Sequence, residues 1–293
     1  MVLTAEAVAG ESGFDAALPL TPLVEFCHNA SLIHDDIEDN SEERRGKPAV
    51  HIIYGTDTAI NGGAFLYFLP LACLSAVAME SKEKIWAAWA GHMRALHLGQ
   101  AMDIAWHRDP LSLPGLDDYD RMCRLKTGCL ASLAAVLGVY CAGTGFPAEG
   151  QNGDMLENLA GFFAEAAEQL GTGFQILDDV KNLDTGVPGK KRGDDIVEGK
   201  KSLPVLLYLH RYPEKRDFVA RCFTGARSRG TEAPEVEELI GALEAAGVLE
   251  EARERGLGYI RKSRESFSSP RAAGFPLKKE GRELLAGLIN LLG

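Results

Sequence analysis

The stretch His34-Asp-Asp-Ile-Glu-Asp39 lies near the start of the chain, and Phe174-Gln-Ile-Leu-Asp-Asp-Val-Lys-Asn182 lies in its middle. Each stretch ends an apolar pattern of helical spacing, and residues four apart share one face of a helix. Asp35 and Asp39 therefore point the same way, with Asp36 beside them. Crowded carboxylates repel one another unless a cation lies between them, and carboxylate oxygens are ligands that suit Mg²⁺. The two clusters together predict Mg²⁺ ions that bind a diphosphate.

The surroundings of both acidic clusters favour a functional site over a solvated helix face. A lone Asp-Asp-x-x-Asp sequence is more often an exposed charged surface. Here the first cluster follows the apolar residues 23–33, and the second follows residues 162–177. Carboxylates at the end of a buried helix are costly, so such groups indicate a site.

Basic residues follow each acidic cluster within a short loop. Arginine binds phosphate oxygens through two parallel hydrogen bonds, and lysine provides a mobile point charge. One basic loop is weak evidence, but the same order of acidic helix and basic loop occurs twice. It predicts two loops that close over a metal-bound diphosphate. Their residues are Arg44 and Arg45 after the first cluster, and Lys190, Lys191, Arg192, Lys200 and Lys201 after the second.

The overall composition is that of a globular protein with a sizeable core. The 293 residues are 46% hydrophobic and 25% charged. A net charge of −11 argues against nucleic acid or an anionic membrane as a partner. The six cysteines form no Cys-x-x-Cys pair, which favours free thiols in a reducing compartment. The first basic residue is Arg44, so the sequence shows no basic signal-peptide region and a cytoplasmic location is expected.

Apolar residues recur with helical spacing along most of the chain and predict an all-α fold. Residues 40–48, 184–201 and 224–234 are predicted loops. Two stretches, 58–79 and 127–148, carry no charge and are long enough to cross a membrane. We expect them to be buried central helices instead, without a stable membrane span. The predicted helices cover residues 16–37, 60–77, 85–106, 119–142, 155–183 and 203–209.

The stretch Asn29 to Pro48 resembles the first aspartate-rich motif of trans-polyprenyl diphosphate synthases. The sequences of residues 29–39 and 102–106 are most similar to those of geranylgeranyl diphosphate synthases of the eukaryotic type. The resemblance implies a single domain over residues 1–293, built as a bundle of about ten or more helices around a central active-site cavity. Further matches occur in family order at Gly99-Gln-Ala-Met-Asp103, Lys126-Thr127, Phe174 to Asp179, and Asp195 to Pro204.

This resemblance implies a Mg²⁺-dependent prenyltransferase that joins isopentenyl diphosphate head-to-tail to an allylic diphosphate. The metal ligands would be Asp35, Asp36, Asp39, Asp178 and Asp179. The allylic diphosphate would be held by Arg44, Lys126, Lys190 and Lys200, and isopentenyl diphosphate would be contacted by Arg45 and His28. Oxygen atoms would be presented to the developing cation by Thr127 and Gln175. The neighbouring groups would be oriented by Gln100 and Asp103.

The resemblance also implies which residues limit the length of the product. Ala30 and Ser31 lie about one turn before Asp35 on the expected wall of the product tunnel. Their small side chains would leave room for a C20 product, geranylgeranyl diphosphate. Candidates for the floor of the tunnel are Phe26, Phe65, Tyr67 and Phe68.

Two features depart from the family pattern. Asn182 stands where the second motif usually has its third aspartate, and the Gly-Lys-x-x-Arg motif that binds isopentenyl diphosphate does not precede the first motif. We therefore expect the chain to lack the first N-terminal helix of the family.

Two other functions are open. The chain could be a non-catalytic partner subunit of a prenyl synthase, which the missing basic motif favours and the complete aspartate sets oppose. It could be a class I terpene cyclase, although the second motif lacks the Asn/Asp, Ser/Thr, Glu triad of those enzymes. The family also implies a homodimer.

Overall fold

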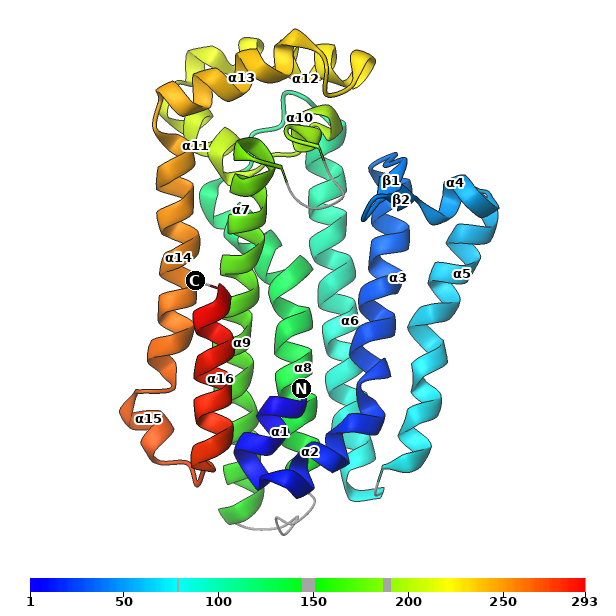
Figure 1. Ribbon diagram of the computed structural model, residues 1–293, viewed down its shortest axis with the longest axis vertical. Coiled ribbons are helices and arrows are strands. Elements are labelled where there is room, and N and C mark those ends of the chain that lie inside the picture. The colour runs from blue at the N-terminus through cyan, green and yellow to red at the C-terminus, as the bar shows by residue number, and fades with distance from the viewer. Residues whose placement is uncertain (78, 144–150, 187–190, 293) are drawn as a thin grey trace.

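Long helices stand side by side in the computed structural model, which describes residues 1–77, 79–143, 151–186 and 191–292 (Figure 1). The helices α3, α5, α6, α8, α9 and α14 run along the long axis, and α10 to α13 cover one end of this bundle. The short helices α1 and α2 lie near the other end, and α16 packs against α1. The prediction of an all-α fold is confirmed.

The helices have the following bounds: α1 Val2–Ala9, α2 Glu11–Ala17, α3 Pro22–Glu38, α4 Val50–Tyr54, α5 Thr56–Phe68, α6 Met79–Arg108, α7 Leu116–Cys123, α8 Cys129–Ala142, α9 Gln151–Asp184, α10 Asp194–Glu198, α11 Leu203–Arg211, α12 Arg216–Arg229, α13 Pro234–Ala245, α14 Val248–Ser266, α15 Pro270–Ala273 and α16 Lys279–Leu292. Two strands, β1 Glu43–Arg44 and β2 Lys47–Pro48, form a small antiparallel hairpin. Short 3₁₀ segments cover Leu18–Leu20, Leu69–Ala76 and Pro213–Lys215.

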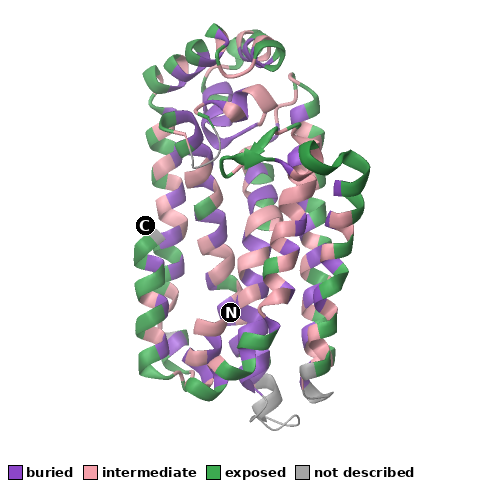
Figure 2. Cartoon of the chain, turned by 45° about the vertical axis from the view of Figure 1, so that its right-hand side comes forward, coloured by how far each residue is buried: buried purple, intermediate pink, exposed green. Residues whose placement is uncertain are grey.

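The centre of the bundle is α8, which packs against α9 and α6. This helix is itself apolar on all faces, and most of its residues are buried. Figure 2 colours every described residue of the bundle by its burial. A helix that is apolar on all faces must be covered by others. A second apolar cluster joins α7, the end of α9 and the helices α11 to α13. The helices α7 and α8 follow one another without a loop, because a π-helical turn at Arg124–Gly128 joins them.

Several predicted boundaries differ from the structure. The predicted helix 16–37 is broken into α2, a 3₁₀ turn and α3, because Pro19 and Pro22 lack backbone donors. The predicted loop 224–234 is wrong over its first half, since α12 continues to Arg229. The predicted loop 184–201 contains the short helix α10, and the predicted loop 40–48 contains the hairpin.

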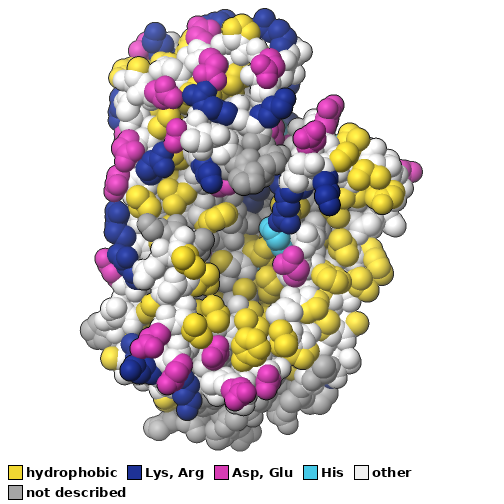
Figure 3. Space-filling model, viewed as in Figure 1, with side chains coloured by type: hydrophobic (Ala, Val, Ile, Leu, Met, Phe, Trp, Pro, Cys, Tyr) yellow, Lys and Arg dark blue, Asp and Glu magenta, His cyan; other side chains and the backbone are white. Residues whose placement is uncertain are grey.

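Among the residues that the structure describes, two helical segments are long and apolar enough to cross a membrane, judged by length and composition. In the segment Leu116–Ala142, 67% of the most apolar window is buried inside the protein, as expected for a central helix. In Thr56–Ser75 the share is only 22%, so the prediction that this stretch is buried is wrong. Figure 3 shows hydrophobic side chains gathered on the corresponding side of the molecule, over α4 and α5.

Gly99 lets α6 approach the π-helical turn closely. A Cβ atom at this position would lie 2.4 Å from the backbone nitrogen of Lys126 and 2.7 Å from the carbonyl carbon of Leu125. Both of these atoms belong to the backbone, so they can give way only if the helices separate. The contact therefore fixes how deep the segment with Lys126 lies beside α6.

Gly99→Ala is predicted to reduce the free energy of unfolding by about 1–3 kcal/mol, the usual cost of overpacking. Chemical denaturation would measure it. Gly91→Ala is the matched control on the same helix, because nothing lies within 4 Å of its Cβ position. That variant should be neutral or more stable by up to about 1 kcal/mol, since alanine favours helix. Equal stability of the two variants would contradict the packing argument.

Candidate functional site

A cavity of about 430 Å³ opens between α3, α5, α6, α9 and the start of α8. Figure 3 shows the hollow at the centre of the molecule, with basic side chains and a histidine at its rim. The structure brings most of the predicted site residues together here. Those that line the cavity are His28, Ser31, Asp35, Arg44, Arg45, Gln100, Lys126, Thr127, Gln175, Asp178 and Lys200, together with the predicted floor residue Tyr67.

The hairpin after α3 places the two arginines. Arg45 and Gly46 form its two-residue turn, with φ angles of 55° and 73°. Positive φ at both positions is the geometry of a type I′ turn, which suits a tight hairpin. Arg44 thereby turns back onto the end of α3, where its Nε donates to Asp36 Oδ1 at 2.8 Å. Its Nη2 lies 3.3 Å from Asp35 Oδ2.

The π-helical turn Arg124–Gly128 carries Lys126 and Thr127. Such turns are rare and frequently occur at functional sites, because the extra residue per turn re-aims side chains. Lys126 Nζ donates to Asp103 Oδ2 at 2.6 Å and to Asp35 Oδ1 at 3.2 Å. Lys126 therefore joins the first aspartate motif to α6. Gln100, one turn before Asp103, donates to the same Asp35 oxygen at 3.0 Å.

Lys200 reaches the first motif from the loop after α10. Its Nζ lies 3.0 Å from Asp39 Oδ2 and 2.7 Å from Glu198 Oε2. Asp39 is the C-terminal cap of α3, and its side chain is 1% exposed. Burial raises the pKa of Asp39 to about 7, although Lys200 acts in the opposite direction. This carboxyl group is thus held in a place that disfavours its charge.

Asp103 and Lys126 hold each other in the ionised state. Burial alone would raise the pKa of Asp103, but Lys126 and Lys200 outweigh it and lower that pKa below the usual value. Burial alone would lower the pKa of Lys126, but Asp103 and Asp35 outweigh it and raise that pKa. At the rim, burial lowers the pKa of His28, which favours its neutral form.

The two aspartates of the second motif face different ways. Asp178 lines the cavity, whereas Asp179 is buried behind its wall. Asp179 accepts hydrogen bonds from Tyr119 and from Gln175. Asn182, the departure from the family pattern, is 1% exposed, and its Oδ1 accepts from the backbone nitrogen of Asp195 at 3.2 Å. This residue thereby anchors α10, the helix that precedes Lys200.

Some predicted residues do not line the cavity. Ala30 is fully buried within the apolar core. Phe65 and Phe68 are 58% and 63% exposed and lie outside the cavity. Asp36, Asp103 and Asp179 are buried partners of the lining groups, and Asp39 lines a separate hollow of about 600 Å³. Lys190 lies outside the described residues.

Sequence reasoning assigned no role to several residues that line the cavity, most of which are apolar or aromatic. His97 lies one turn before Gln100, and Leu130 lies one turn after Thr127, so helical spacing could have identified both. The ring centroids of Tyr67 and His97 are 5.0 Å apart, and both residues line the cavity together with Leu96 and Leu130. The missed residues are Leu32, His34, Glu38, Leu96, His97, Leu130 and Phe174.

The donor atoms fit a hard divalent cation such as Mg²⁺. Across the described part of the chain, no group of three or more histidine, cysteine or acidic side chains is already arranged as a metal site. Carboxylate oxygens at the motif ends are paired with Arg44, Lys126 and Lys200 instead. A bound cation would be held by Asp35, Asp39 and Asp178, because carboxylate oxygens suit Mg²⁺.

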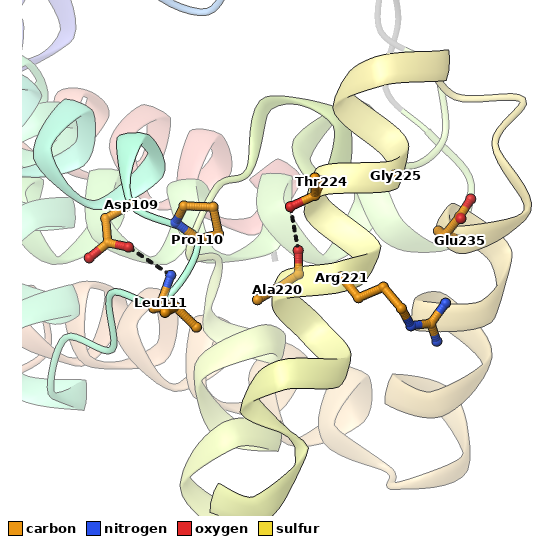
Figure 4. Close-up of a pocket in the computed structure, with 8 residues that line it drawn as sticks. All are labelled: Asp109, Pro110, Leu111, Ala220, Arg221, Thr224, Gly225 and Glu235. Atoms are coloured by element: carbon orange, nitrogen blue, oxygen red, sulfur yellow. Dashed lines mark hydrogen bonds between the residues drawn. The ribbon is translucent and has the colours of Figure 1, made fainter.

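A second hollow, of about 580 Å³, lies on the surface between the loop after α6 and α12 (Figure 4). Its charged side chains serve local structure. Asp109 Oδ1 accepts from the backbone nitrogen of Leu111 at 2.9 Å, and Arg221 pairs with Glu238 at 2.7 Å. None of the predicted site residues lines this hollow.

Comparison with known proteins agrees with this geometry. The family model described as polyprenyl synthetase matches residues 1–242. The chain belongs to the polyprenyl synthetase family. It is 36% identical over 186 residues to geranylgeranyl pyrophosphate synthase 1 of Zymoseptoria tritici, which covers 63% of this chain and 51% of that protein. The chain spans about half the length of the curated relatives it matches.

Solved structures of the family show the same fold. The geranylgeranyl pyrophosphate synthetase of Pyrococcus horikoshii matches with a TM-score of 0.81 and 28% identity, over 99% of this chain and 83% of that one. A polyprenyl synthase of Caulobacter crescentus matches with a TM-score of 0.79 and 27% identity, over 99% of this chain and 81% of that one. That structure was solved in complex with calcium and isoprenyl diphosphate.

Asp39→Asn is predicted to stabilise the metal-free protein at about pH 8. Because the pKa of Asp39 is raised from 3.8 to about 7, the folded state holds a proton that the unfolded chain releases. Stability therefore falls as pH rises between those values, and asparagine removes this loss. Thermal unfolding should show a gain at about pH 8 and little change at about pH 5.

If Mg²⁺ stabilises the parent protein, the same variant should lose that stabilisation. Asp15→Asn, at an exposed position on α2, is the control and should keep it. An Asp39→Asn protein that is less stable at every pH, or that responds fully to Mg²⁺, would contradict this assignment.

Proposed function

We propose that the protein is a Mg²⁺-dependent polyprenyl diphosphate synthase that joins isopentenyl diphosphate head-to-tail to an allylic diphosphate. One observation carries the proposal. A single cavity is lined by Asp35 and Asp178 from the two motifs, by the cations Lys126 and Lys200, and by apolar side chains such as Leu96 and Leu130. An amphiphile with a diphosphate head and a hydrocarbon tail fits a lining that is both charged and apolar.

The chain's own residues would act mainly by electrostatic positioning. Bound Mg²⁺ would supply positive charge that stabilises the departing diphosphate. Arg44, Lys126 and Lys200, which now pair with carboxylates, would turn to the phosphate oxygens once a metal takes those carboxylates. Thr127 and Gln175 would present oxygen atoms towards the positive charge that develops on the allylic carbon.

We propose a C20 product, geranylgeranyl diphosphate, formed from farnesyl diphosphate or a shorter allylic primer. The small Ser31 lines the cavity one helical turn before Asp35, and we assign the floor of the tunnel to Tyr67, His97 and Leu96, which also line the cavity. The match to fungal geranylgeranyl pyrophosphate synthases at about 35% identity supports the same product. Because Ala30 is buried in the core, we assign control of product length to Ser31.

Incubation with Mg²⁺, labelled isopentenyl diphosphate and farnesyl diphosphate tests the proposed function, with product length measured by chromatography. The expected product is C20. Ser31→Phe should shorten the product and Tyr67→Ala should lengthen it, because the first fills the wall and the second opens the floor. Asn29→Phe, on the same helix but outside the cavity, is the control for added bulk.

Unchanged product length in both cavity variants would remove the assignment of wall and floor. A wild-type protein that forms no product alone, but alters the products of an added active synthase, would indicate the partner subunit. Product formation from the allylic diphosphate without isopentenyl diphosphate would indicate a terpene cyclase.

We also propose a homodimer in which a second copy covers the exposed apolar face of α4 and α5. Ile53, Ile60, Phe65 and Phe68 on this face are each at least half exposed. Exposed apolar patches of this kind mark sites of association. Sedimentation should find a dimer in the parent protein and a monomer in Phe68→Glu. Leu288→Glu, on α16, is the control for an exposed apolar residue elsewhere. A parent protein that sediments as a monomer would contradict the proposal.

A further inference from the structure

A chain of hydrogen bonds runs from the buried core to the cavity wall. The Tyr119 hydroxyl donates to Asp179 Oδ2 at 2.7 Å. The Gln175 Nε2 donates to the other oxygen of Asp179, Oδ1, at 2.8 Å. The Thr127 hydroxyl donates to Gln175 Oε1 at 2.6 Å. Each donor has one defined acceptor, so the chain fixes the direction of every group in it.

The direction of these hydrogen bonds determines which atoms of Thr127 and Gln175 face the cavity. Because Gln175 uses its amide nitrogen on Asp179, its oxygen faces Thr127, and both residues line the cavity. The Thr127 hydroxyl donates its hydrogen to that oxygen, so both side chains present oxygen lone pairs to the cavity. A reversed amide would instead place N–H groups there, which would repel a developing positive charge.

Tyr119 is the end of the chain and lies away from the cavity. It is fully buried on α7 and packs in the apolar cluster around the end of α9. A buried hydroxyl group is costly unless it has a partner. Asp179 is also buried, and its pKa is raised to about 6 by burial, with the hydrogen bonds from Tyr119 and Gln175 opposing that rise. The hydrogen bond between Tyr119 and Asp179 therefore gives each of these two buried polar groups a partner.

We propose that Tyr119 is a positioning residue, which acts through Asp179 to keep the Gln175 oxygen turned towards the cavity. This inference rests on the proposed function, because it gives that oxygen a role in prenyl transfer. It also assigns Asp179 to the support of Gln175, whereas Asp178 is the aspartate of the second motif that faces the cavity. Tyr119 itself touches no substrate.

The test is Tyr119→Phe, which removes only the hydroxyl group and keeps the buried ring. Loss of one charge-assisted hydrogen bond that orients a group in the transition state should lower kcat about 10-fold. KM for both substrates should stay within about twofold, because the diphosphate contacts are untouched. Tyr140→Phe is the matched control, since the Tyr140 hydroxyl donates to Glu157 at 2.9 Å away from the cavity.

A double variant separates positioning from a general loss of stability. In a Gln175→Ala background, Tyr119→Phe should have little further effect on kcat, because the group that it orients is gone. An undiminished effect in that background, or a parallel rise in KM, would overturn the proposal. So would a Tyr119→Phe enzyme with parental kcat.

Crystal structures of the parent and of Tyr119→Phe give a measurement that does not depend on the reaction. The proposal expects the contact between Gln175 and Asp179 in the parent, and a rotated or disordered Gln175 amide in the variant. An unchanged Gln175 in the variant would overturn it. If the parent protein forms no prenyl product, the proposed function fails, and these structures still decide whether Tyr119 orients Gln175.

Discussion

The rest of the structure depends on one constraint: the buried carboxylates at the end of α3 must be neutralised by cations from other segments. Arg44 comes from the hairpin, Lys126 from the π-helical turn and Lys200 from the loop after α10. Removing one of these cations leaves an uncompensated buried carboxylate, which is strongly destabilising. These three segments are therefore held against α3 by electrostatics as well as by apolar packing.

The same pairs make the cavity ready for an exchange of partners. A divalent cation and a diphosphate are opposite in charge, and the cavity wall has both signs in close contact. If a metal binds the carboxylates, the lysines and the arginine are released for phosphate oxygens, so every charge has a partner once both ligands are bound. Packing sets the distances at which this exchange occurs, with Gly99 fixing Lys126 and Asn182 anchoring the helix before Lys200.

Much of this arrangement could be predicted from the sequence, because helical spacing and short motifs report local neighbours. The aspartate clusters, the basic loops and the all-α class followed from such patterns. The sequence did not show that Asp36 and Asp179 do not line the cavity. Two acidic residues that are adjacent in sequence can point in different directions, one into the cavity and the other into the protein behind it. Tyr119 gave no signal either, since its role arises from a contact with a residue 60 positions away. The exposure of α5 also escaped prediction, because an apolar helix looks the same whether its cover lies within the chain or outside it.

The exchange of partners is tested most directly by the thermal unfolding of the purified protein with Mg²⁺ alone, inorganic pyrophosphate alone, and both together. Ligands that bind the folded state raise its unfolding temperature in proportion to their binding free energy. The account predicts that the shift with both ligands exceeds the sum of the separate shifts, because each ligand frees the groups that the other needs. A shift with both that equals the sum, or a full shift with pyrophosphate alone, would contradict it.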